Sequence, residues 1–188
     1  MLLAKAGFYP FTTSRPFRYS PSGNSSATGW SAAAPKRSMI FASAPALEVA
    51  RENLAANPFD AARVELMQAD VFAYLRQLRD RASVFDLVVL DPPKFAPTAA
   101  QAHNAARAYK DINLMALRLL APGGLLATFS CSGGVPSELF QSIVAGAALD
   151  AGVEAKIIER FGAAADHPVA LEFPEGDYLK GLLVVRNA

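Results

Sequence analysis

The segment from Phe85 to Leu90 constrains the fold more than any other part of this sequence. It is a nearly continuous apolar run, interrupted only by Asp86, and Asp91-Pro92-Pro93 follows it directly. Runs of this kind are typical of central strands in parallel sheets, which are covered on both faces. The two prolines lack backbone N–H donors and hold the following loop extended. We therefore expect a buried parallel strand that presents Asp91 at its carboxyl end.

Helix-like and strand-like segments alternate along the chain on both sides of this run. Helices are predicted to begin near Ser43, Asp70 and Ser137, and another to end near Leu120. Further strands are predicted at Val64–Met67, Leu125–Phe129, Ala155–Ile158 and Leu179–Val185, with a turn at Pro122-Gly123-Gly124. This alternation predicts an α/β fold with a mostly parallel twisted sheet. The last strand, with 168–173 as its candidate partner, predicts an antiparallel hairpin at the C-terminal edge.

Composition narrows the class of protein. A chain of 188 residues with 52% apolar content is long enough to bury one core. No apolar run reaches the roughly 18–20 residues needed to cross a bilayer, so we expect no membrane segment. One cysteine excludes an internal disulfide, and two histidines argue against a conventional zinc site. These counts indicate a cytoplasmic protein without a metal.

Charge is distributed unevenly along the chain. The first 47 residues contain no acidic side chain, whereas the remainder is net acidic. No basic stripe of the kind that marks a nucleic-acid surface is visible. If RNA is the substrate, other protein segments are expected to supply much of the phosphate contact.

Three polar residues follow predicted strands, where ligands bind in open α/β sheets. They are Asp70, Asp91 and Cys131. Each also has a structural interpretation: Asp70 as a helix N-cap, Asp91 as part of a turn, and Cys131 as a small buried apolar residue. The position of Cys131 after a buried strand and before Gly133-Gly134 favours a functional role.

The ordered motifs of the chain carry a family resemblance over about residues 43–186. The sequence resembles the bacterial 23S ribosomal RNA cytosine-5 methyltransferases of the DPPKF type, which are class I S-adenosylmethionine-dependent enzymes with a Rossmann-like fold. The motifs that match are Phe85–Phe95, Tyr109–Asn113, Pro122-Gly123-Gly124, Thr128–Gly133, Asp166-His167-Pro168, Pro174-Glu175-Gly176 and Tyr178–Gly181. A lone Asp-Pro-Pro would be weak, because amino-methylating enzymes also carry it.

The resemblance implies roles for individual residues. Asp70 would accept a hydrogen bond from the adenine amino group of S-adenosylmethionine, and Val71 and Phe72 would line the ring. Asp91 and Pro92 would face both the methionine and the target base. The implied substrate-binding residues are Pro93, Lys94, Phe95, Tyr109 and Lys110. Lys94 could instead be a solvated loop lysine, Tyr109 a core residue, and His167 either a structural loop residue or a substrate contact.

Cytosine C5 is a poor nucleophile, and its methylation therefore needs covalent help. A thiolate that adds to C6 makes C5 enamine-like; after methyl transfer a base removes the C5 proton and the thiolate leaves. Cys131 is the only cysteine of the chain, so it is the candidate nucleophile. Asp91 could hydrogen-bond the cytosine amino edge, and the base must leave its stack to enter the site.

The N-terminal part departs from the family pattern. The family has a glycine-rich motif after its first strand and an acidic residue at the end of its second, which holds the ribose hydroxyls. Here Gly23 and Gly29 lie in a Ser-rich stretch, Phe41 occupies the acidic position, and the usual RNA-binding PUA domain is absent. We expect an irregular segment at 1–42, best explained by a shifted frame or misplaced start, and an incomplete methyltransferase domain at 43–188. A targeting segment or a truncated, cofactor-impaired form are the alternatives.

The resemblance thus predicts methyl transfer to C5 of a cytosine in ribosomal RNA, with 23S RNA as the partner. Two alternatives stay open: a guanine-N7 or amino-directed nucleic-acid methyltransferase, which would not need Cys131, and a non-catalytic remnant that cannot bind the cofactor. The target nucleotide is not fixed by the sequence, nor is the oligomeric state, for which a homodimer is one option.

Overall fold

A computed structural model describes residues 2–5, 37–41, 44–56 and 64–187 of the chain. Its elements, in chain order, are β1 (Leu2–Lys5), β2 (Arg37–Phe41), α1 (Ala44–Ala56), β3 (Val64–Gln68), α2 (Val71–Asp80), β4 (Phe85–Asp91), η2 (Ala99–Gln101), α3 (Ala102–Arg118), β5 (Leu120–Ser130), α4 (Ser137–Ala151), β6 (Ala155–Phe161), η3 (Pro174–Gly176) and β7 (Lys180–Arg186). The predicted Ser43 cap and the helix stop at Asn57-Pro58 lie outside these ranges.

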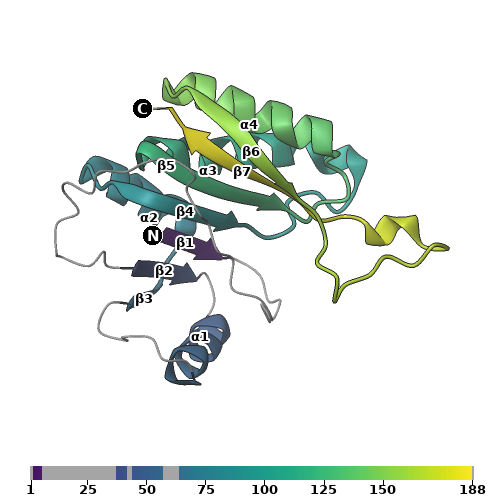
Figure 1. Cartoon of the computed structure of the whole chain (residues 1–188), viewed down its shortest axis with the longest axis horizontal. Helices are drawn as coiled ribbons and strands as arrows, with labels where there is room; N and C mark the ends of the chain where they lie inside the picture. Colours follow the sequence, from purple (N-terminus) through teal and green to yellow (C-terminus); the bar gives the residue numbers. More distant parts are fainter. Residues whose placement is uncertain (1, 6–36, 42–43, 57–63, 188) are drawn as a thin grey trace, which may run out of the picture.

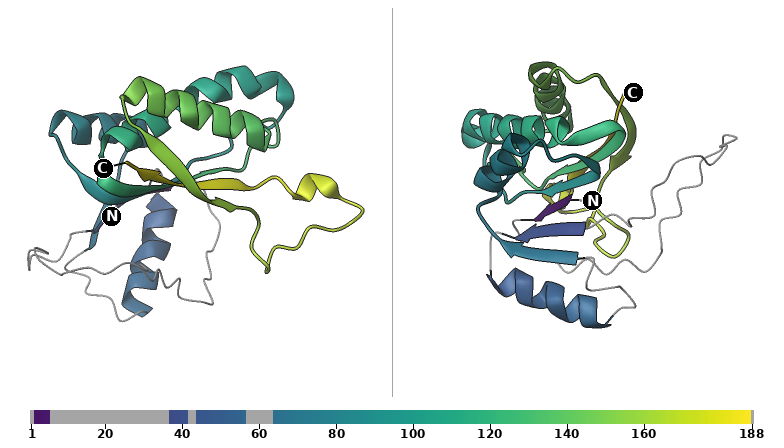
Figure 2. Two further views of the ribbon diagram at one scale, coloured as in Figure 1. Left: turned by 45° about the horizontal axis from the view of Figure 1, so that its top comes forward. Right: turned by 90° about the vertical axis from the view of Figure 1, so that its left-hand side faces the viewer.

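One sheet of seven strands, in the order β3-β2-β1-β4-β5-β7-β6, forms the centre of the molecule (Figure 1). The strands from β3 to β5 are parallel, and β7 pairs antiparallel with both β5 and β6. Helices α2, α3 and α4 cover one face, and α1 lies against the other face near β2 and β3 (Figure 2). The predicted α/β fold with an antiparallel C-terminal edge is therefore confirmed.

The core lies between the sheet and the three helices on its first face. Its fully buried side chains come from β4, β5, α2, α3 and α4, with Leu75, Val88, Leu126 and Phe140 among them. The apolar run of β4 is buried only at alternate positions, Val88 and Leu90, so one face of this strand is covered less completely than expected for a central strand covered on both faces. This packing fixes the carboxyl ends of β4 and β5 rigidly beside each other.

Two expectations for the C-terminal half need correction. The segment 168–173 does not pair with the last strand; β7 instead pairs with β6 along its length, and Pro168 could not donate to a ladder in any case. The expected turn at Pro122-Gly123-Gly124 lies inside β5 as an irregularity in its register with β4. Gly123 has a φ of +76°, and a Cβ on Gly124 would lie 2.8 Å from the Ala121 carbonyl oxygen, so both positions require glycine.

The expectation of an irregular segment at 1–42 is wrong for the two short strands that the structure describes there. β1 pairs in parallel with β2 and β4, and β2 pairs with β3. Four or five residues carry too little pattern to announce a strand, and these two are held by neighbours that are distant in sequence. Gly23 and Gly29 lie outside the described residues, and the division of the chain at residue 43 remains a prediction.

Candidate functional site

The carboxyl ends of the five parallel strands share one edge of the sheet and bring the candidate residues together. Asp91, the last residue of β4, is in register with Lys5, which is in register with Phe41 at the end of β2. Phe41 is in register in turn with Gln68 at the end of β3. Asp70 follows β3 by two residues, and Cys131 follows β5 directly. The sheet therefore places both carboxylates and the thiol at the edge where ligands bind in such folds.

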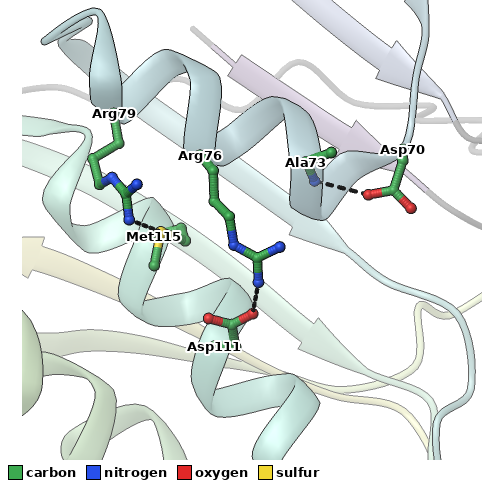
Figure 3. A network of polar contacts seen from close by, with 6 residues as sticks. All are labelled: Asp70, Ala73, Arg76, Arg79, Asp111 and Met115. Atoms are coloured by element: carbon green, nitrogen blue, oxygen red, sulfur yellow. Dashed lines mark hydrogen bonds and ion pairs between the residues drawn. The ribbon is translucent and has the colours of Figure 1, made fainter.

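Asp70 caps helix α2, as the structural interpretation of this residue predicted. Its Oδ1 accepts a hydrogen bond of 2.7 Å from the backbone N–H of Ala73 (Figure 3). The side chain is exposed, so its second oxygen is available to a ligand donor. Val71 is buried and Phe72 half-buried directly after it. Capping and cofactor binding are thus compatible roles for Asp70, because they use different carboxylate oxygens.

The β4–α3 loop has an inner and an outer side. Pro92 is buried and Phe95 is half-buried, with its ring centroid 4.8 Å from that of Tyr109 and 6.2 Å from that of Phe72. Pro93 and Lys94 are exposed, and the Lys94 Nζ lies 5.8 Å from the ring centroid of Tyr178. Of the five predicted substrate contacts, Pro93 and Lys94 are therefore the exposed ones, whereas Phe95 packs inward.

Cys131 is half-buried between the charges of this loop and those of β7. Burial raises the pKa of the Cys131 thiol, and the neighbouring Asp91 carboxylate raises it further. The cations of Lys94 and Lys180 act in the opposite direction and favour the thiolate. A thiol in this setting is mostly protonated near neutral pH, so nucleophilic attack would require Asp91 to be neutralised or its charge to be paired by a bound substrate.

Lys180, at the start of β7, is a residue of this site to which the motifs assigned no role. Its Nζ donates to the carbonyl oxygens of Ser132, at 2.7 Å, and Val135, at 2.5 Å. Burial lowers the pKa of Lys180, while the neighbouring Cys131 and Asp177 raise it. Its backbone is in register with Ser130, because β7 is inserted beside β5. That pairing is non-local, which is why the order of motifs alone could not place Lys180 beside Cys131.

A hollow of about 270 Å³ adjoins the turn that follows Cys131. Its walls come from that turn, from the start of α4 and from the segment that leads into β7; they are Gly133, Pro136, Ser137, Glu175, Asp177, Tyr178, Leu179 and Lys180. The lining offers an aromatic ring, two carboxylates and an ammonium group. Such a set could receive a flat polar group such as a nucleotide base.

Two of the predicted RNA-binding residues, Tyr109 and Lys110, make contacts within the protein. Tyr109 is fully buried, which supports the core alternative for this residue rather than direct RNA contact. Lys110 forms an ion pair of 2.7 Å with Asp150, in the last turn of α4. This pair joins α3 to the C-terminal end of α4, whereas the Cys131 turn lies beside the N-terminal end of α4. The pair Arg76–Asp111 joins α2 to α3 in a similar way (Figure 3).

Three further observations concern a loop histidine, metal binding and membrane spans. His167 is exposed and lies 3.2 Å from Asp166, whose pKa it lowers; a structural role and a substrate contact both stay open for this loop histidine. Within the described ranges, no three His, Cys, Asp or Glu side chains converge as a metal site would require. No helix in those ranges is both long and apolar enough for a membrane span.

Comparison with known proteins identifies relatives over most of this chain. It is 57% identical over 138 residues to Ribosomal RNA large subunit methyltransferase I of Shewanella amazonensis, covering 73% of this chain and 35% of the relative. It is 57% identical over 145 residues to the protein of the same name from Tolumonas auensis, covering 77% and 36%. The chain thus spans about a third of the length of these relatives. No family model matches it.

A solved methyltransferase structure resembles this chain in its fold. SMU.776, assigned as a methyltransferase and complexed with SAH, matches 80% of this chain and 39% of its own length, with a TM-score of 0.65 and 18% identity. The chain has the Rossmann-like fold of methyltransferases. At such low identity the likeness concerns the fold alone, because one fold serves many reactions.

Proposed function

We propose that this chain is the catalytic part of an S-adenosylmethionine-dependent methyltransferase that acts on C5 of a cytosine in large-subunit ribosomal RNA. The observation that carries the proposal is the meeting of Cys131 and Asp91 at the carboxyl ends of β5 and β4. The 57% identity to enzymes named as ribosomal RNA large subunit methyltransferases supports the substrate class. The SAH in the structure of SMU.776 supports the cofactor.

The residues of the described part fit one side of this cofactor. Asp70 offers an exposed carboxylate to the adenine amino group, Phe72 a half-buried ring beside it, and Asp91 with Pro92 the wall near the methionine. When bound, S-adenosylmethionine supplies an electrophilic methyl group. On the ribose side, the residue at the end of β2 is Phe41, which cannot accept a hydroxyl hydrogen bond.

In the proposed reaction, the Cys131 thiolate forms a bond to C6 of the cytosine. Electron density moves to C5, which becomes nucleophilic; C5 would then take the methyl group as the S–CH3 bond of the donor breaks, with S-adenosylhomocysteine as the leaving group. A base then removes the C5 proton, the C5–C6 double bond re-forms, and the thiolate leaves. Asp91 would accept a hydrogen bond from the cytosine amino group, which also offsets the repulsion that disfavours the thiolate.

Removal of the thiol tests the proposal. We expect Cys131→Ala to abolish formation of 5-methylcytidine in 23S RNA, measured by nucleoside mass spectrometry with labelled S-adenosylmethionine. Cys131→Ser is the matched control for volume, and its weaker nucleophile should also fail. Methyl transfer to C5 by Cys131→Ala would refute covalent catalysis. Methylation at guanine N7 or at an amino group would favour the alternative enzyme class.

Phe41 at the end of β2 is the observation that favours a second candidate, a non-catalytic remnant. Such a domain would keep the fold and the RNA-facing loop but would lack cofactor affinity. Calorimetric titration with S-adenosylmethionine separates the two, since heat of binding to the whole chain supports the enzyme, whereas no binding at millimolar ligand supports the remnant.

A further inference from the structure

Three buried hydroxyl groups form a hydrogen-bonded series on the core side of Cys131. The Ser130 Oγ donates to the Tyr109 hydroxyl at 2.9 Å, and that hydroxyl lies 2.9 Å from the Ser132 Oγ. The Ser132 Oγ also accepts from the backbone N–H of Ala96 at 3.0 Å. The three side chains are fully buried, with 0% of their surface exposed. Polar groups at such depth are costly unless they are paired, so this arrangement fixes their positions closely.

These hydrogen-bonded hydroxyl groups lie between the two segments that carry the proposed chemistry. Ser130 and Ser132 are the immediate neighbours of Cys131, and their side chains enter the core while that of Cys131 is half-exposed. Ala96 directly follows the loop that begins at Asp91. Tyr109 comes from α3 and belongs to neither segment. Its hydroxyl therefore holds both serines of the turn that carries the thiol, and Ser132 in turn links that turn, through the Ala96 N–H, to the loop that carries the carboxylate.

The environment of Tyr109 keeps this hydroxyl in place. Its ring packs edge-on against Phe95, at 4.8 Å between centroids, and against Phe140, at 5.5 Å. Burial raises the pKa of the Tyr109 hydroxyl, so it retains its proton near neutral pH. Because Ser130 donates to Tyr109, the tyrosine proton is available for Ser132, which makes the series continuous. On the far side of the turn, Lys180 holds the Ser132 carbonyl.

We propose that Tyr109 is a positioning residue: its hydroxyl holds the Cys131 turn through Ser130 and Ser132, while its ring packs against Phe95 of the Asp91–Phe95 loop. The inference rests on the proposed function, because it assigns the fixed geometry to attack of the thiolate on a base held by Asp91. Tyr109 acts through Ser130 and Ser132 and touches no substrate. A thiol held at a fixed distance and orientation from its target reacts far faster than one that is free to move.

The single cysteine gives a direct test, since alkylation of the whole chain by iodoacetamide reports on Cys131 alone. Tyr109→Phe keeps the packed ring and removes only the hydroxyl. The released turn should admit water to the thiol, and its pKa should then fall toward that of a free cysteine. A lower pKa raises the thiolate fraction at neutral pH, so alkylation there should become roughly threefold faster. Tyr74→Phe, a change at a buried tyrosine of α2, is the matched control and should leave the pH profile unchanged.

Two results would overturn the proposal. One is a pH profile of Tyr109→Phe that superimposes on that of the unaltered chain; the other is an equal shift in Tyr74→Phe. If Tyr109→Phe does not fold, as judged by circular dichroism, Ser130→Ala decides in the same way, because it removes a hydrogen-bond partner of Tyr109 and leaves the Ser132–Ala96 link in place.

Methyl transfer is measured in the same preparations and separates this proposal from the proposed function. Tyr109→Phe should lower kcat roughly tenfold or more while KM for S-adenosylmethionine changes little. An unchanged kcat in an active chain would refute the positioning role. If the unaltered chain itself transfers no methyl group, the proposed function fails, whereas the alkylation profiles still decide whether Tyr109 fixes the turn.

Discussion

Asp91 and Cys131 oppose each other electrostatically, and this is the central property of the site at the scale of single residues. The carboxylate raises the pKa of the thiol, after burial has already raised it. Asp91→Asn removes the charge and keeps the shape, so the pKa of Cys131 should fall. Alkylation of Cys131 by iodoacetamide should then rise at neutral pH, with its half-maximal rate displaced to lower pH, even though methyl transfer is lost.

The control for this change lies on the same strand. Asp86 is exposed near the start of β4, at the opposite end from Asp91. Asp86→Asn alters the net charge equally and should leave the alkylation profile in place. A profile that does not move in Asp91→Asn would mean that burial alone sets the pKa of Cys131, and the proposed offset of charge by a bound cytosine would lose its basis.

Helix α2 shows how far local sequence signals determine an element. Asp70 precedes an apolar pattern of helical spacing, and both the cap and the helix appear where the sequence predicts them. The cap bond from Ala73 N–H to Asp70 predicts that Asp70→Ala lowers the free energy of unfolding by about 1 kcal/mol. Urea denaturation followed by circular dichroism measures this loss.

Two further variants of α2 sharpen that measurement. Asp80→Ala removes an exposed carboxylate from the last residue of the helix, where the helix dipole disfavours it, and should cost nothing. Asp70→Asn keeps a capping oxygen and should retain most of the stability, yet it should weaken binding of the adenine amino group. Equal stability of Asp70→Ala and Asp80→Ala would show that the cap contributes little.

Pairings between distant segments are what the sequence could not supply. β4 was predictable from its apolar run, whereas β1 is four residues long and exists as a strand through β2 and β4. The insertion of β7 between β5 and β6 likewise depends on contacts over long separations. A serine at the end of an apolar strand, or in the turn after it, looks like an ordinary tolerated polar residue, so a role for Ser130 and Ser132 was not predicted. Their positions on either side of Cys131 were the one available signal.

At the scale of the whole molecule, the two halves of the ligand edge differ in character. The β4–β5 half carries Asp91 and Cys131 in a rigid setting, and these positions follow from motifs within the chain. The β2 end carries Phe41 in register with Lys5, where the resemblance implies an acid. The sheet therefore forms with Asp91 and Cys131 in place at one half of this edge, while the end of β2 carries no acidic residue.

This asymmetry leads to a prediction of gained affinity. Phe41→Asp should restore a carboxylate for the ribose hydroxyls, and hydrogen bonds to a charged group contribute about 1.5–3 kcal/mol, or roughly tenfold or more in Kd. Titration calorimetry of the whole chain with S-adenosylmethionine measures the gain. Phe41→Leu is the control, because it shortens the side chain without supplying an acceptor. If Phe41→Asp and Phe41→Leu bind equally, the loss lies elsewhere on that side of the site, since a single carboxylate at the end of β2 would then be insufficient to hold the ribose.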